Sequence, residues 1–366
     1  MKDINRNCFV ELLRFLFCFL IINYHFFSHF LRNVDFPNFF IRSYMGDEFF
    51  FIITGFFLSK AATFAENDCI EWSVKQLTKR IKKIAIPYYV TWILCFLGLR
   101  FTREFIGKTN RSIFLDAANS TYELLFLNMF GFKKGLYSND VAWFFSALLI
   151  VTFVLGPLIA KYKSNFSLYF APLIALFSYG MLSLNYDYLH DPMQTIPNTF
   201  LLKGLIRAFA GICIGSFLYG VIQSNVLNYF MQKSKKNLRR LICLIDFLLW
   251  TIIIFYMVYP FKSNAGKLSI QYDYIIVIFM TAALLPVLGN MWSNNYKQQL
   301  VEKIANKLGR YAYFAFFGQA IFYSVDKVIY SLNIGILFKA LILNISVAVI
   351  SIALGILTHK ISFAKK

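Results

Sequence analysis

The sequence predicts an all-α integral membrane protein in which about ten helices form one bundle, with both termini in the cytosol. Of its 366 residues, 58% are hydrophobic and only 15% are charged. In soluble domains about a quarter of the residues are charged. The net charge of +19 could suggest a nucleic-acid partner. However, the basic residues form short clusters between apolar runs, as in membrane proteins. This pattern excludes a soluble enzyme and a nucleic-acid-binding protein.

Ten apolar segments are long enough, or nearly so, to cross a bilayer of about 30 Å. They cover residues 9–30, 45–61, 84–101, 141–161, 168–184, 204–222, 240–260, 272–292, 310–330 and 336–358. The second and fifth are short, and the stretch 121–131 is too short to cross, so we expect it at the interface or re-entering the membrane. The first segment lacks a small-residue cleavage signal, which favours a retained helix over a signal peptide.

The distribution of lysine and arginine predicts the orientation of these segments. Basic clusters fall in every second connection, which we therefore place in the cytosol. They contain Lys2 and Arg6; Lys75, Lys79, Arg80, Lys82 and Lys83; Lys161 and Lys163; Lys233, Lys235, Lys236, Arg239 and Arg240; Lys297, Lys303, Lys307 and Arg310; and Lys360, Lys365 and Lys366. The connection 100–140 is also basic and is the exception. No linker divides the chain, so residues 1–366 are expected to form a single domain.

The six cysteines give no indication of a disulfide framework or a metal site, because none of them forms a CxxC pair. We expect reduced thiols and no metal.

Arg14 and His25 are the most informative residues. Eleven residues at about 100° each return to within about 20° of the starting direction, so both side chains project from one side of a helix. Their separation along the helix axis is about 16 Å, half the thickness of the hydrocarbon layer. Because ionisable residues are costly in lipid, they are expected to face a protein interior or a wet cavity and to mark a site.

Glu11, Cys18 and His29 lie on the same side of this helix as Arg14 and His25, and we call this side the stripe. A purely structural interpretation stays open, in which Glu11 pairs with Arg14 at the membrane boundary and His25 only packs. His29 lies near the outer boundary, where an interfacial histidine is ordinary.

Two further motifs contain charged residues. Asp47 and Glu48 begin the second apolar segment, where a helix N-terminus stabilises carboxylates. Gly55 in the same segment permits close packing of helices.

The basic cluster at 79–83 lies just inside the membrane, with Pro87 expected in the first turns of the next helix. Such a cluster either anchors the helix and binds anionic lipid, or holds the phosphates of an anionic cosubstrate.

Taken together, ELLRFLFCFLIINYHF, GDEFFFIITGF, KRIKKIAIPYY and AWFFSALL, in this order, resemble the membrane-bound acyltransferase family 3. The resemblance is densest over residues 6–90 and 140–150. This chain has Glu11 where the family usually has Asp, and Thr54 where it has Ser. Lys83 replaces the second arginine of an RxxR-like loop that begins at Arg80.

The resemblance implies a multi-pass protein of the inner (plasma) membrane that transfers an acyl group to a surface or lipid-linked glycan. Acetyl-CoA or another acyl-CoA would be the cosubstrate, with no bound cofactor. Its phosphates would be held by Arg80, Lys82 and Lys83, and Arg14 would guide it towards His25. Glu48 or Asp47 would orient His25 or bind the acceptor.

His25 would act as the general base or carry the acyl group itself, and the sequence does not separate these roles. A transporter or flippase for a lipid-linked glycan is the alternative, since ten spans and buried polar residues fit it too. A transporter has no need of the stripe from Arg14 to His25 or of the basic cluster.

Overall fold

The computed structural model describes residues 7–30, 37, 39–65, 68–107, 112–131, 139, 141–224, 236–260, 272–289 and 298–364. Helices make up 85% of the structure, and this part of the chain contains no strand, which confirms the predicted all-α class. Thr195 and Leu202 form an isolated antiparallel bridge.

The long helices are α1 (Cys8–Phe30), α2 (Gly46–Ala62), α3 (Cys69–Phe105), α6 (Ala142–Asn165), α7 (Ala171–Asn185), α8 (Lys203–Gln223), α10 (Lys236–Val258), α11 (Tyr272–Leu288), α12 (Gln298–Ser324) and α14 (Ile336–Ala364). The short elements are η1 (Ser43–Met45), α4 (Ile113–Asn119), α5 (Thr121–Leu124), η2 (Asn128–Phe130), η3 (Phe166–Phe170) and α13 (Asp326–Ser331). A helix is therefore found at each of the ten predicted segments.

Six stretches of the described helices are long and apolar enough to cross a membrane: α1, α3, α6 continued into α7, α8, α10 and α14. The predicted spans 141–161 and 168–184 correspond to two helices, α6 and α7, which the π-helix η3 connects without a loop. The chain bends there at Lys163, where φ is 43°. The helices α2 and α11 have 17 residues each, and α12 carries charged side chains in its first half.

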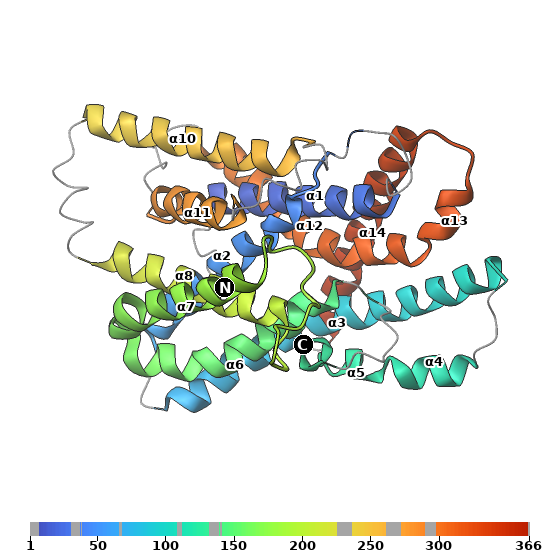
Figure 1. Ribbon diagram of the computed structural model, residues 1–366, viewed down its shortest axis with the longest axis horizontal. Helices are drawn as coiled ribbons and strands as arrows, with labels where there is room; N and C mark the ends of the chain where they lie inside the picture. The colour runs from blue at the N-terminus through green and yellow to red at the C-terminus, as the bar shows by residue number, and fades with distance from the viewer. Residues whose placement is uncertain are drawn as a thin grey trace.

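Successive long helices run in alternating directions, so the bundle has two distinct ends, and several helices follow its long axis in Figure 1. At one end, the Asn7 side chain before α1 donates a hydrogen bond of 2.6 Å to the Val287 carbonyl near the end of α11. We call this the basic end. The described members of the predicted cytosolic clusters lie there, on the last turns of α6 and α14 and the first turns of α3, α10 and α12. The opposite end of the bundle is called the histidine end, and there His29 Nδ1 lies 3.2 Å from Asp326 Oδ2.

The basic connection 100–140, the exception to the charge rule, lies at the histidine end. Its arginines are paired there, because Arg100 and Arg103 donate to the buried Asp116 carboxylate at 3.2 and 2.6 Å. These pairs reduce the net positive charge of the connection. The stretch 121–131 forms only α5 and η2 and does not cross the bundle, as expected from its length.

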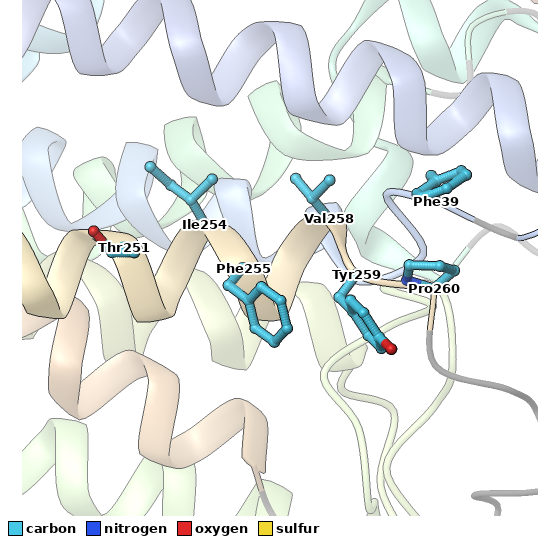
Figure 2. A pocket seen from close by; sticks show the side chains of 7 residues that line it. All are labelled: Phe39, Thr251, Ile254, Phe255, Val258, Tyr259 and Pro260. Atoms are coloured by element: carbon cyan, nitrogen blue, oxygen red, sulfur yellow. The ribbon is translucent and has the colours of Figure 1, made fainter.

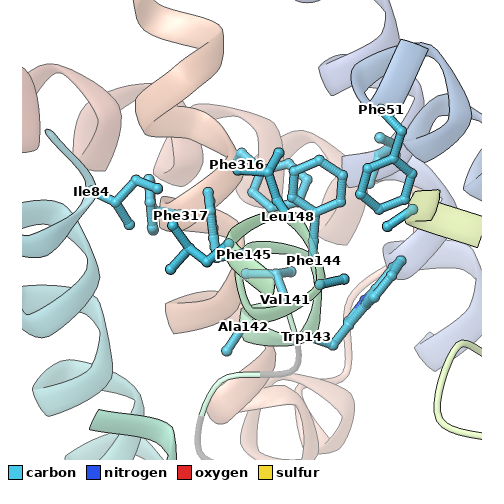
Figure 3. Close-up of a cluster of buried hydrophobic side chains, with 14 of the residues drawn as sticks. Phe51, Ile84, Val141, Ala142, Trp143, Phe144, Phe145, Leu148, Phe316 and Phe317 are labelled. Atoms are coloured by element: carbon cyan, nitrogen blue, oxygen red, sulfur yellow. The ribbon is translucent and has the colours of Figure 1, made fainter. Parts of the chain in front are cut away.

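Aromatic side chains of α6 and α12 form the centre of the core, and Figure 3 shows them interleaved with residues of α2 and α3. Phe145 of α6 stacks on Phe317 of α12 with ring centroids 4.5 Å apart, and Phe144 stacks on Phe51 of α2 at 4.6 Å. This packing fixes α2 and α12 on either side of α6 and so fixes the helices that carry or flank the candidate site.

Close packing of α2 against α8 depends on glycine. A Cβ atom at Gly55 would overlap the Ile212 carbonyl of α8, and one at Gly215 would overlap the Ile52 carbonyl of α2. The predicted role of Gly55 in close helix approach is therefore confirmed.

We expect Gly55→Ala to lower the free energy of unfolding by about 1–3 kcal/mol or more, because the obstructing atoms are backbone and cannot rotate away. Gly180→Ala on α7 is the matched control, since no heavy atom lies within 4 Å of the added methyl group. It should stabilise the protein by about 0.5–1 kcal/mol through helix propensity. Unfolding in mixed detergent micelles measures both changes. Equal effects at the two positions would contradict the close-approach role.

The helix α3 begins earlier in the chain than the sequence predicts. It was predicted over 84–101, but it begins at Cys69 with an Asp68 cap and has 37 residues, about 55 Å of helix. The basic cluster is thus on the first half of a continuous helix rather than in a loop, and Pro87 lies in its middle. Hydropathy recognised only the apolar half, because the first half is charged.

A hydrogen bond from another helix compensates for Pro87. Proline has no backbone N–H, so Pro87 cannot give the usual helix hydrogen bond to the Lys83 carbonyl one turn earlier. The hydroxyl of Tyr313 on α12 donates to that carbonyl at 3.0 Å. The Thr91 hydroxyl also donates to the Pro87 carbonyl.

Tyr313→Phe should therefore destabilise the protein by about 1 kcal/mol, the usual net contribution of one hydrogen bond. In a Pro87→Ala background the helix supplies its own N–H, and the cost of Tyr313→Phe should fall clearly below that value. A double-mutant cycle of unfolding free energies in detergent tests this coupling. An unchanged cost in the two backgrounds would show that the Tyr313 hydroxyl does not substitute for the missing helix bond.

Candidate active site

Arg14 lies near the basic end of α1 and keeps part of its surface exposed. It donates to the Glu11 carboxylate at 2.5 Å, which is the pairing that the structural interpretation of this helix expected. Its guanidinium carbon lies 5.5 Å from the ring centroid of Phe57 on α2, and 30% of its side chain is accessible. Part of the guanidinium is therefore accessible at the basic end, beside Phe57 of α2.

His25 lies on the same side of α1, about 16 Å closer to the histidine end. Its ring is partly exposed, with the Tyr24 ring centroid at 5.1 Å and the Tyr323 centroid at 5.7 Å. None of the residues that the structure describes forms a hydrogen bond with its ring nitrogens. The imidazole therefore lies between aromatic rings, and its nitrogens are available to a substrate.

Glu48 is fully buried in the first turn of α2, where its oxygens are occupied by two donors. Arg207 Nε of α8 donates to Oε1 at 2.6 Å, and the Tyr179 hydroxyl of α7 donates to Oε2 at 2.5 Å. Arg207 also lies 3.7 Å from the Asp47 carboxylate. No hydrogen bond between Glu48 and His25 is found in the described part of the chain, so Glu48 acts directly on α8 and α7.

A second buried carboxylate, Asp273 at the start of α11, organises the histidine end. It accepts hydrogen bonds from the hydroxyls of Tyr44 and Tyr256 at 2.8 and 2.7 Å, and from the Leu189 N–H at 2.8 Å. These donors come from η1, α10 and the connection between α7 and α8. Asp273 therefore holds that connection against the bundle, with the His190 ring 5.6 Å from that of Tyr44.

The sequence interpretation missed the buried partners of this site. Arg207 offers the same signal as Arg14, an arginine inside an apolar run, and could have been found in that way. Asp273 begins a helix, where a carboxylate is equally explained as a favourable end charge. Tyr44, Tyr179 and Tyr256 give no signal, because tyrosine is common at membrane boundaries.

The basic cluster of α3 lies at the basic end, separated from α1 by α12. Arg80 and Lys83 are three residues apart and share one side of α3, whereas Lys82 projects to a different side. Both lysines are exposed, and Arg80 is partly exposed. The Lys83 ammonium lies 4.9 Å from the Tyr313 ring centroid. The carbonyl of the preceding residue of α12, Ala312, accepts a hydrogen bond from the Cys18 thiol of α1, so Lys83 and Cys18 lie at similar depth.

A groove of about 420 Å³ lies along the final turns of α10, where Figure 2 shows its apolar lining. It is lined by Phe39, Thr251, Ile254, Phe255, Val258, Tyr259 and Pro260. It contains none of the predicted site residues and no charged side chain, so we assign it no part in the chemistry.

The comparisons with known proteins identify a family but no individual relative. A family model described as an acyltransferase domain matches residues 7–360. No curated protein and no solved structure matches the chain. The family model spans both ends of the bundle and all the site residues described above.

Proposed function

The chain belongs to the membrane acyltransferase family 3, and from this we propose that it acylates a glycan with an acyl group taken from cytosolic acyl-CoA. Acetyl is the proposed acyl group, and a surface or lipid-linked saccharide is the proposed acceptor. The carbonyl–sulfur bond of the thioester breaks, a carbonyl–oxygen bond to the acceptor hydroxyl forms, and the hydroxyl proton ends on the CoA thiol. We place this multi-pass protein in the inner (plasma) membrane.

The observation that carries the proposal is the placement of Arg14 and His25 on one helix between two chemically different ends. Arg14 lies near the basic end, where Arg80, Lys82 and Lys83 supply positive charge for the phosphates of CoA. His25 lies about 16 Å further along, comparable to the reach of an extended pantetheine arm of about 15 Å. A donor bound by its phosphates at the basic end would thus present its thioester to His25.

Reconstitution in proteoliposomes tests this function. Purified protein receives radiolabelled acetyl-CoA, together with lipid-linked saccharides extracted from membranes of the producing cells. We expect label in the saccharide fraction that depends on protein, donor and time. Movement of unmodified saccharide across the bilayer without acyl transfer would instead support a flippase.

Arg14→Ala should raise the acyl-CoA concentration needed for half-maximal rate by about ten- to a hundredfold, since a hydrogen bond to a charged group contributes about 1.5–3 kcal/mol. The maximal rate should change less. The matched control is Arg310→Ala, at an exposed position on α12. An unchanged donor dependence in Arg14→Ala would remove Arg14 from the donor site.

A further inference from the structure

A second histidine is bound to a carboxylate at the histidine end. His29 Nδ1 lies 3.2 Å from Asp326 Oδ2, and the backbone N–H of Lys327 donates to Oδ1 of the same carboxylate at 2.6 Å. Both oxygens of Asp326 are therefore engaged, which fixes the carboxylate. The His29 and Asp326 side chains are 24% and 27% exposed, so the pair is open to a ligand.

Tyr323 places this pair next to His25. Its ring stacks on His29 with centroids 4.9 Å apart and an interplanar angle of 20°, and its centroid lies 5.7 Å from that of His25. Its hydroxyl donates to the Ile22 carbonyl of α1 at 2.7 Å, which fixes the ring. His25 and His29 are one turn apart on the same side of α1, so two imidazoles flank one fixed ring.

The two imidazoles differ in their surroundings. A carboxylate at Nδ1 fixes the tautomer in which that nitrogen carries the proton, so Nε2 can accept one, as a general base requires. Asp326 begins the short helix α13, outside the six spans. Burial disfavours its charge, but the hydrogen bond with His29, together with the backbone N–H and the charge of Lys327, outweighs burial and holds the pKa of Asp326 below its usual value. His25 has no such partner among the described residues, which suits a nucleophile better than an oriented base.

We propose that His29, oriented by Asp326, takes the proton of the acceptor hydroxyl, and that His25 carries the acyl group between donor and acceptor. The inference rests on the proposed function and assigns separate roles to the two histidines. It makes His29 a catalytic residue and Asp326 a positioning residue.

The reaction then has two balanced steps. In the first, a ring nitrogen of His25 attacks the thioester carbonyl carbon, the carbon–sulfur bond breaks, and the ring proton passes to the thiolate. In the second, the acceptor oxygen attacks the acyl carbon while its proton moves to Nε2 of His29. The carbon–nitrogen bond breaks, and the proton on His29 returns to His25.

The two steps can be measured separately in proteoliposomes. Incubation with radiolabelled acetyl-CoA alone measures covalent labelling of the protein, and later addition of the extracted lipid-linked saccharides measures transfer. We expect His29→Gln to take up label to the wild-type level and to transfer it about 10²–10⁴-fold more slowly, the usual contribution of general base catalysis. Asp326→Asn should show the same pattern with a smaller loss, and Asp326→Glu should recover part of the rate. His25→Ala should take up no label.

His359→Gln is the matched control, because this histidine is exposed near the basic end of α14 and should leave both steps unchanged. Wild-type transfer in His29→Gln would overturn the inference. Equal loss of labelling and transfer would overturn it as well, since it would show that the pair only ties α1 to α13. Transfer by the wild-type protein without covalent labelling would remove the carrier role of His25. If the wild-type protein transfers no label to saccharide at all, the proposed function itself fails.

Discussion

His25→Ala should abolish acyl transfer to the glycan while the protein still folds and remains in the membrane. A base contributes about 10²–10⁴-fold to the rate, and loss of a nucleophile that carries the acyl group leaves no route at all. The ring is partly exposed and lies at a tilt to the rings of Tyr24 and Tyr323, so its removal should cost little stability. Label transfer and the unfolding midpoint in detergent, measured on the same preparation, check both parts.

His359→Ala serves as the control for this variant, and we expect wild-type rates from it. Substantial transfer by His25→Ala would exclude His25 from the chemistry. A parallel loss of folding and activity would show that the histidine only packs, which is the structural alternative that the sequence left open.

Arg207→Met should lower the free energy of unfolding by about 3–5 kcal/mol, the usual cost of leaving a buried charge without its partner. The Arg207 side chain is 1% exposed and is bound to Glu48, with Asp47 nearby. Its loss leaves two carboxylates at the start of α2 without a counter-charge. Chemical unfolding in mixed detergent micelles measures the change, and Arg310→Met, on the exposed side of α12, should stay within about 0.5 kcal/mol.

The double variant Glu48→Gln with Arg207→Met tests whether the cost is electrostatic. Removing both charges should be less destabilising than the sum of the single changes, because the neutral amide needs no counter-ion. Additive effects would show that Arg207 stabilises the protein through packing alone, for example against Trp143.

The local features of the site could be predicted from the sequence, and the contacts between distant segments could not. The stripe on α1 and the Glu11–Arg14 pair follow from helical spacing within one apolar run. In contrast, His29 and Asp326 are 297 residues apart, and each alone is an ordinary boundary residue. The same holds for Glu48 and Arg207, which are 159 residues apart.

The fold, like the site, could be predicted from the sequence only in part. Apolar runs locate a helix at each predicted segment, because burial in lipid demands such runs. They do not show where a helix begins when its first turns lie outside the lipid and carry charge, as in α3. Nor do they show that α6 and α7 are joined by a π-helix, since that depends on local backbone geometry.

The hydrogen bonds of Asp273 have a consequence for how the protein is made. Leu189, Tyr44 and Tyr256 all precede Asp273 in the chain, so their donors leave the ribosome before their acceptor does. Until α11 is inserted, the connection between α7 and α8 has no anchor at this point, and the two hydroxyls must bind water or lipid headgroups. We therefore expect this end of the protein to be assembled late in biosynthesis, when α11 meets segments synthesised long before it.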